Sequence, residues 1–150
     1  MTRSTAREIA VHLIYAAQSG SESWDTVLQT RFQDEYYAQL AQENEIYAEK
    51  PRGKQKAYIA AAVAGVKEHL PELEEAIARY SIGWNLNRIS RLSRAIMELA
   101  MYEALYVEDV PVNVAIHEAL LLAQKYEEPE TAAFVNGILG AFSRSLEPQA

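Results

Sequence analysis

The chain contains no cysteine, which excludes disulfide bonds and metal sites built on thiolates. Its three histidines, His12, His69 and His117, are too scattered to offer the spacing of metal ligands. The sequence has no glycine-rich phosphate loop and no Ser-His-Asp or Cys-His arrangement. His117 and its neighbour Glu118 point about 100° apart on a helix, so they do not form an acid/base pair. We therefore expect no metal, no cofactor and no enzymatic activity.

Long hydrophobic runs are also absent. No window reaches the roughly 18 uninterrupted apolar residues that a membrane span requires, and the amino terminus has no long apolar region. We expect a cytoplasmic protein with no membrane partner.

Positive charge is scarce, since 14 Lys and Arg stand against 21 Asp and Glu, for a formal net charge of −7. This balance argues against a broad surface for polyanions, so any RNA binding must be local. One basic stretch, from Arg79 to Met97, contains no acid. It is either a second binding surface, for RNA or for an acidic patch on a partner protein, or simply part of a balanced helix surface. A second group of basic residues lies around a predicted loop at 44–53, where we expect solvated charges: Lys50, Arg52, Lys54 and Lys56.

What the chain has is helical periodicity. A length of 150 residues with 49% hydrophobic residues suits one domain that buries close to 70% of its unfolded surface. Residues 109–139 read as two apolar helices joined by a short acidic turn, and the first of them is apolar nearly all round, which predicts that it is buried. No alternating pattern typical of strands competes, so we predict an all-α fold of about seven helices.

The first helix is predicted to run from a capping box at Thr5 and Glu8 to about Ser19. Its apolar residues follow helical spacing, while a second stripe points away from this face: Arg7, Val11, Tyr15 and Gln18. Arg3 falls just ahead of the helix. These residues are either contacts for a partner or a solvated helix end.

Further helices are predicted over about 23–40, 55–70, 71–80 and 89–107, with a break at Gly83. Trp84 and Leu86 lead into the helix that starts near Ile89. The break divides the chain into halves of about 1–82 and 83–150, but no flexible linker separates them. We therefore predict one domain over residues 1–150.

In the last helix, Gly137 and Gly140 lie opposite the apolar stripe, and each costs roughly 1 kcal/mol relative to Ala. They provide either packing room or the close approach of another helix or of a ligand backbone.

Three segments of the chain resemble the transcription antitermination factor NusB family. DVPVNVAIHEALLLAQKY followed by AAFVNGIL is similar to its carboxy-terminal half, STAREIAVHLIY to its opening helix, and RLSRAIMELAMYEALYVEDVP to its central helix. Residues 20–55 match nothing. The resemblance implies two packed three-helix bundles that form one compact domain, with their join near Gly83.

The resemblance also implies a function. Such factors bind a short single-stranded RNA element, boxA, together with the ribosomal protein NusE, and so help the RNA polymerase antitermination complex to transcribe ribosomal RNA. A few arginines and aromatic side chains can suffice to read unpaired bases. Carried over position by position, the RNA-binding residues are Arg3, Arg7, Tyr15, Phe134 and Asn136.

Two other functions remain open. One is a protein-interaction module with lost or weak RNA affinity. The other is a stand-alone form of the NusB-like accessory domain found ahead of some RNA cytosine methyltransferases, which is disfavoured because no Rossmann-type domain follows in the sequence. Some relatives are homodimers that cover the RNA-binding face and others are monomers, and the sequence does not decide between them.

Overall fold

The computed structural model describes residues 1–83 and 89–147. Within these ranges the chain forms helices and no strand, which confirms the predicted all-α fold. The α-helices of this part number eight, with a short 3₁₀ helix between the third and fourth: α1 (Arg3–Ser19), α2 (Trp24–Arg31), α3 (Asp34–Glu43), η1 (Glu45–Tyr47), α4 (Gly53–Glu68), α5 (Leu70–Tyr80), α6 (Arg91–Tyr106), α7 (Val112–Tyr126) and α8 (Pro129–Ser145).

The count exceeds the expected seven because the predicted helix over 23–40 is two helices. Phe32 ends α2 and Gln33 caps α3, so the chain turns between them. Trp84, Leu86 and Arg88 lie outside the described residues. None of the helices in the described ranges is long and apolar enough to cross a membrane.

The chain divides into two compact units, Met1–Lys67 and Glu68–Ala150, which we call unit 1 and unit 2. The division falls at the end of α4 and not at Gly83, where the sequence analysis set it. The reason is that α5 packs against α6 and α8, with Leu73 and Ile77 buried, and so belongs to the carboxy-terminal unit.

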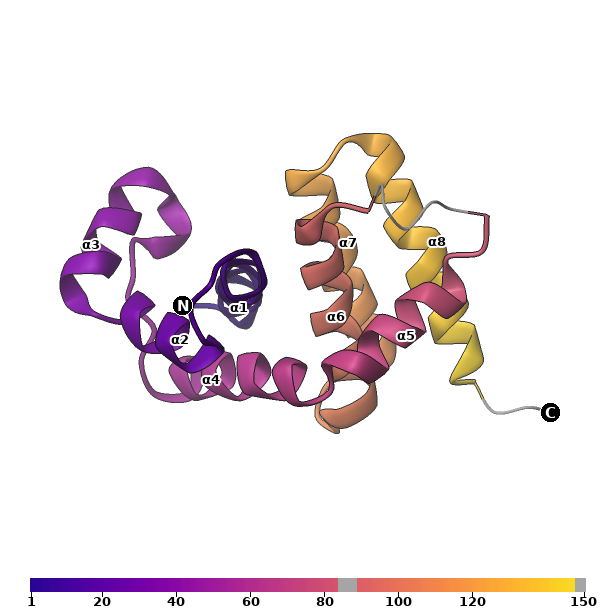
Figure 1. The fold of residues 1–150 in the computed structure, drawn as a ribbon, viewed down its shortest axis with the longest axis horizontal. Coiled ribbons are helices and arrows are strands. Elements are labelled where there is room, and N and C mark those ends of the chain that lie inside the picture. Colours follow the sequence, from indigo (N-terminus) through magenta and orange to yellow (C-terminus); the bar gives the residue numbers. More distant parts are fainter. Residues whose placement is uncertain (84–88, 148–150) are drawn as a thin grey trace. The chain divides into compact units, whose positions relative to one another are not determined.

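Unit 1 is built around α1, which contacts α2 and η1 (Figure 1). The helix begins earlier than predicted, because the hydroxyl of Thr2 accepts a hydrogen bond from the backbone N–H of Thr5 at 3.1 Å. Thr5 therefore lies inside the first turn and is not the cap. The prediction of a second stripe facing away from the core is wrong as well, because Arg7 and Val11 are buried. Neighbouring segments cover more of α1 than its apolar stripe alone.

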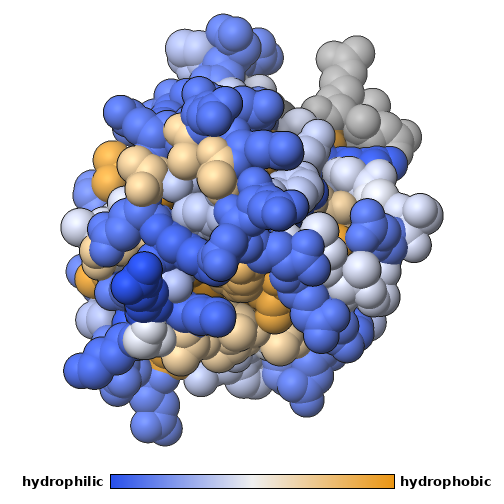
Figure 2. Space-filling model, turned by 90° about the vertical axis from the view of Figure 1, so that its left-hand side faces the viewer, coloured by the Kyte–Doolittle hydropathy of each residue, from blue (hydrophilic) through white to orange (hydrophobic). Residues whose placement is uncertain are grey.

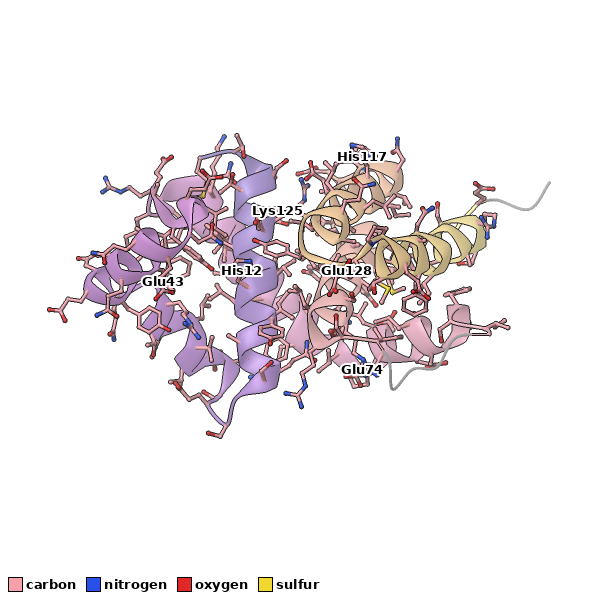
Figure 3. All side chains as sticks on the ribbon, turned by 90° about the horizontal axis from the view of Figure 1, so that it is seen from above. His12, Glu43, Glu74, His117, Lys125 and Glu128 are labelled. Carbon is pink, nitrogen blue, oxygen red and sulfur yellow. The ribbon has the colours of Figure 1, made fainter. Side chains whose placement is uncertain are left out.

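A group of hydrogen-bonded rings ties η1 to α1 and α3. The Nδ1 atom of His12, on α1 (Figure 3), lies 2.6 Å from the hydroxyl of Tyr47. The ring of Tyr37 meets that of Tyr47 edge-on, with centroids 5.5 Å apart, and its hydroxyl donates to the carbonyl of Glu49 at 2.7 Å. Burial raises the pKa of Tyr37 to about 12, and the Glu49 carboxylate acts in the same direction.

Unit 2 consists of α6, α7 and α8 packed on one another, with α5 against α6 and α8 (Figure 1). Leu99 on α6 is buried, and so are three residues of the predicted apolar stripe on α8: Val135, Ile138 and Phe142. Leu146, the last residue of that stripe, is 38% exposed. The prediction that α7 is buried all round is wrong, because Val114 is 38% and Leu121 47% exposed. One side of α7 packs into unit 2, and these two side chains lie on another side.

The start of α6 is joined to the end of α7. Ser90 caps α6 by accepting a hydrogen bond from the N–H of Ser93 at 3.0 Å. The hydroxyl of Ser90 donates to Oε1 of Glu127 at 2.6 Å, and that of Ser93 donates to the same oxygen at 3.1 Å. The first turn of α6 has no acid of its own, so Glu127 brings negative charge to a helix N-terminus that favours it.

Candidate nucleic-acid interface

In unit 1, the start of α1 and the first turns of α4 meet around one aromatic ring. Nε of Arg3 donates a hydrogen bond to Oε1 of Gln55 at 2.8 Å, and its guanidinium carbon lies 4.2 Å from the centroid of the Tyr58 ring. Gln55 and Tyr58 are three residues apart on α4 and therefore neighbours on its surface. The guanidinium of Arg7 lies 5.9 Å from the same ring. Both predicted arginines are thus brought together around the ring of Tyr58.

The two arginines differ in exposure. Arg3 is half-buried, so part of the residue remains accessible, whereas Arg7 is only 6% exposed. The prediction that Arg7 faces away from the core is therefore wrong. Its burial suits it to hold Tyr58 in place beneath Arg3 more than to contact a ligand.

Tyr15 is an accessible aromatic residue on the same helix, with 41% of its surface exposed. It follows Arg7 by eight residues, which is about 12 Å along an α-helix. The prediction that Tyr15 is exposed is confirmed.

In unit 2, α8 carries the remaining two candidates in different environments. Successive turns of 100° place Phe134 and Asn136 about 160° apart around the helix axis. Phe134 is 5% exposed and packs in the core, while Asn136 is exposed. The Phe134 ring is therefore not accessible to an RNA base, and its role is to hold α8 in unit 2.

Asn136 lines an open groove of about 510 Å³ between α7 and α8. The groove combines the amides of Gln124 and Asn136 with the carboxylate of Glu127 and apolar side chains; its lining is Leu120, Gln124, Glu127, Pro129, Ala132, Ala133 and Asn136. Gln124 is not among the residues predicted from the sequence; it lies one turn after Leu120 on α7 and therefore on the same face of the helix.

The glycines of α8 do not serve close packing in this structure. A Cβ added at Gly137 would meet no atom within 4 Å, and one at Gly140 would lie 3.4 Å from Nη1 of Arg144. Gly137 is exposed, so the side of α8 that carries it is open for a close approach from outside.

The basic stretch 79–94 has acidic neighbours in space that its sequence does not show. Nη2 of Arg79 pairs with Oε1 of Glu75 at 2.7 Å. Arg94 lines a small cavity together with Glu98 and Glu74, which is on α5 (Figure 3). Over its described residues, this stretch is therefore part of a balanced helix surface.

The two histidines of unit 2 belong to no metal-ligand group within the described residues. His69 stacks on Tyr106 with ring centroids 4.0 Å apart, and His117 is exposed on α7 (Figure 3). Over residues 1–83 and 89–147, no group of three or more His, Asp or Glu side chains could hold a metal ion.

The helical arrangement matches solved structures of NusB. It agrees with NusB of T. maritima at a TM-score of 0.78 and 27% identity, covering 99% of this chain and 94% of that one. A structure described as the antitermination factors NusB and NusE in complex with dsRNA gives a TM-score of 0.73 over 95% and 96% of the two chains; at 18% identity it shows the fold alone. The fold defines the class: all-helical proteins with the NusB fold.

Sequence comparison gives the family. The sequence pattern of the NusB family matches residues 4–144. The transcription antitermination protein NusB of Thermoanaerobacter sp. (strain X514) is 37% identical over 144 residues, which are 96% of this chain and 91% of that protein. NusB of Ruminiclostridium cellulolyticum is 32% identical over 149 residues, covering 99% and 93%. The chain belongs to the NusB family. It is thus an antitermination factor and not an enzyme, as the sequence analysis expected.

Proposed function

We propose that this antitermination factor binds boxA-type single-stranded RNA together with NusE in the cytoplasm, and so supports transcription of ribosomal RNA within the RNA polymerase antitermination complex. The two units act together as one RNA-binding domain over residues 1–150. The family match across both units supports this proposal, as does the shared fold with a NusB found in complex with NusE and RNA.

The observation that carries the proposal is the packing of Arg3 on Tyr58. An arginine that lies over an aromatic ring and donates to a neighbouring amide is held in one orientation, which lowers the entropy that RNA binding costs. Its free N–H groups are suited to a phosphate or to the edge of an unpaired base. Arg7 supports the ring from within the fold.

The groove on unit 2 supplies a second set of contacts. The side-chain amides of Gln124 and Asn136 each offer two donors and an acceptor, which is the chemistry needed to recognise the edge of an unstacked base. Tyr15 offers an exposed ring for stacking on RNA or for contact with NusE. In this assignment Phe134 acts only through the position of α8.

Charge explains why a partner is needed. A chain of net charge −7 repels a polyanion at long range, so a few local contacts yield modest affinity. A basic partner that shares the RNA backbone reduces this repulsion. We therefore expect RNA binding to be much stronger with NusE than without it.

The test is a binding titration with boxA RNA and a scrambled RNA, with and without NusE, at several salt concentrations. Replacing Arg3→Gln should reduce the slope of log affinity against log salt by about 0.7, the contribution of one single-strand phosphate contact. The control Arg144→Gln removes an equal charge from the exposed last turn of α8 and should leave the slope unchanged. If the wild-type protein with NusE does not prefer boxA RNA, the proposal fails.

Tyr15 provides a separate test of the contact surface. Tyr15→Ala should weaken assembly with NusE and RNA while changing Tm little, because much of the ring is already in solvent. A large fall in Tm with unchanged assembly would make Tyr15 a structural residue.

A protein-interaction module with weak RNA affinity is the second candidate. The burial of Arg7 and Phe134 favours this second function, because buried side chains cannot make two of the five expected RNA contacts. NusE binding in the absence of any boxA preference would support this function. A homodimer that covers the RNA-binding face is a competing assembly, and light scattering with and without RNA measures it.

A further inference from the structure

A second group of cations lies at the entrance to α4, in the stretch 20–55 and just beyond it. Lys50, Arg52, Lys54 and Lys56 fall within seven residues with no acid between them. Lys50 is half-buried and the other three are exposed. Gly53 has a φ of +54°, a conformation that favours glycine, and this residue begins α4. The turn delivers the basic residues to the surface around the first turn of the helix.

These cations are close together in space as well as in sequence. Lys50 forms an ion pair with Asp34 at the start of α3. The same carboxylate has its pKa lowered by the hydrogen bond and charge of Lys50 and, to a smaller degree, by the charges of Arg52 and Lys56. Lys50 thus contacts this exposed acid directly, while Arg52 and Lys56 lie near enough for their charges to act on it. Nζ of Lys56 also lies 5.6 Å from the centroid of the Phe32 ring, at the end of α2.

The group is continuous with the arginine at the start of α1. Lys54 and Tyr58 are four residues apart on α4 and so lie on one face of the helix. Tyr58 is the ring beneath Arg3, and Gln55 accepts the hydrogen bond from Arg3. Positive charge thus runs from α1 across the first turn of α4 to the loop before it. We call this surface the basic strip: Arg3, Lys50, Arg52, Lys54 and Lys56.

The basic strip differs from the rest of the chain. Five of the 14 Lys and Arg residues of a protein with net charge −7 are gathered here. The end of unit 1 seen in Figure 2 is mainly hydrophilic, with apolar side chains between the polar ones. Within the strip, two aromatic rings lie under cations, Phe32 under Lys56 and Tyr58 under Arg3. Like charges held this close repel one another, and a bound polyanion relieves that repulsion.

We propose that the basic strip binds the phosphodiester backbone of RNA that flanks the boxA element. The RNA footprint then continues beyond Arg3, over the first turn of α4, to the loop that holds Lys50 and Arg52. Exposed lysines around helix and loop suit contact with phosphates and not the reading of bases, so the added affinity is independent of the flanking sequence. This inference rests on the proposed function and extends the RNA footprint from Arg3 to the four cations around the start of α4.

The experiment compares two RNAs in the presence of NusE. One contains boxA alone, and the other carries about ten additional nucleotides on each side, a length within the range that single-strand binding surfaces cover. Lys54→Gln with Lys56→Gln is the test variant. Lys67→Gln with Arg144→Gln is the matched control, because it removes two exposed positive charges at sites outside the strip. Tm and circular dichroism verify that all proteins fold alike.

The wild-type protein should bind the longer RNA more tightly than boxA alone, with a steeper dependence on salt. The test variant should lose about 1.4 from the salt slope on the longer RNA, twice the contribution of one phosphate. Over the roughly 0.8 log units between 0.15 M and 1 M salt, this corresponds to about tenfold weaker binding at 0.15 M. Its affinity for boxA alone, and both affinities of the control variant, should change little.

Other outcomes overturn the inference in distinguishable ways. Normal boxA binding without any gain from the flanks, or equal losses in the test and control variants, would leave the proposed function standing and remove the strip from the footprint. Weaker assembly of the test variant with NusE in the absence of RNA would identify the strip as a protein contact. Failure of the wild-type protein to bind either RNA would overturn the proposed function and this inference together.

Discussion

Replacing Leu99→Ala tests whether the middle of α6 is part of the core. Leu99 is 3% exposed, so the substitution removes three buried carbon atoms. At about 0.8 kcal/mol for each, the lost transfer free energy is roughly 2.4 kcal/mol. A cavity that does not collapse adds about 1–2 kcal/mol, which gives an expected loss of about 3.4–4.4 kcal/mol.

Leu105→Ala on the same helix is the matched control. Leu105 is 37% exposed, and Ala is at least as good a helix former, so its loss should stay below about 1 kcal/mol. The assay is equilibrium unfolding in urea, with comparable m values required for both variants. If Leu99→Ala costs less than about 1 kcal/mol, or no more than the control, the burial argument for α6 is refuted.

Three further predictions concern single side chains. The pKa of Tyr37 is raised to about 12, so its neutral form stabilises the fold at pH values below about 10, and this stabilisation is lost as pH rises toward 12. Tyr37→Phe should therefore flatten the dependence of the free energy of unfolding on pH between about 10 and 12. Gly137→Ala should raise the free energy of unfolding by up to about 1 kcal/mol, because a Cβ there meets nothing within 4 Å, and a fall in stability would contradict the open geometry. Arg7→Ala should lower Tm, since Arg7 is buried near the Tyr58 ring, and an unchanged Tm with weaker RNA binding would show that it contacts RNA after all.

Periodicity and local motifs predict much of this fold. The helical spacing of residues 109–139 and the break before α6 give the all-α class, and the FVNG and IHEA-like segments give the family. These features are local: they depend on residues three or four apart or on short contiguous motifs. Tyr15, on the polar side of the first helix, was placed correctly for the same reason.

What could not be predicted depends on contacts between distant segments. A helical wheel shows which residues share a face but not how many faces are covered, and so Arg7 was predicted to be exposed and Val114 to be buried. The placement of Arg3 over Tyr58 joins residues that are 55 positions apart in the chain, with no local signal for their pairing. Thr2 and Thr5 can both cap the N-terminus of a helix. In the structure Thr2 is the cap, so α1 begins at Arg3, earlier than the capping box at Thr5 predicts.

The bond between Ser90 and Glu127 has a consequence for the order in which unit 2 assembles. The carboxylate that completes the α6 cap lies 37 positions further along the chain, so α6 lacks this partner until α7 has formed and docked. If the start of α6 or the end of α7 unfolds, the other loses its hydrogen-bond partner. The two helices should therefore fold and unfold together as one cooperative hairpin. Hydrogen exchange should therefore report matching protection for the amides of the first full turn of α6, beginning with Arg94, and of the last turn of α7, and Glu127→Ala should lower both together.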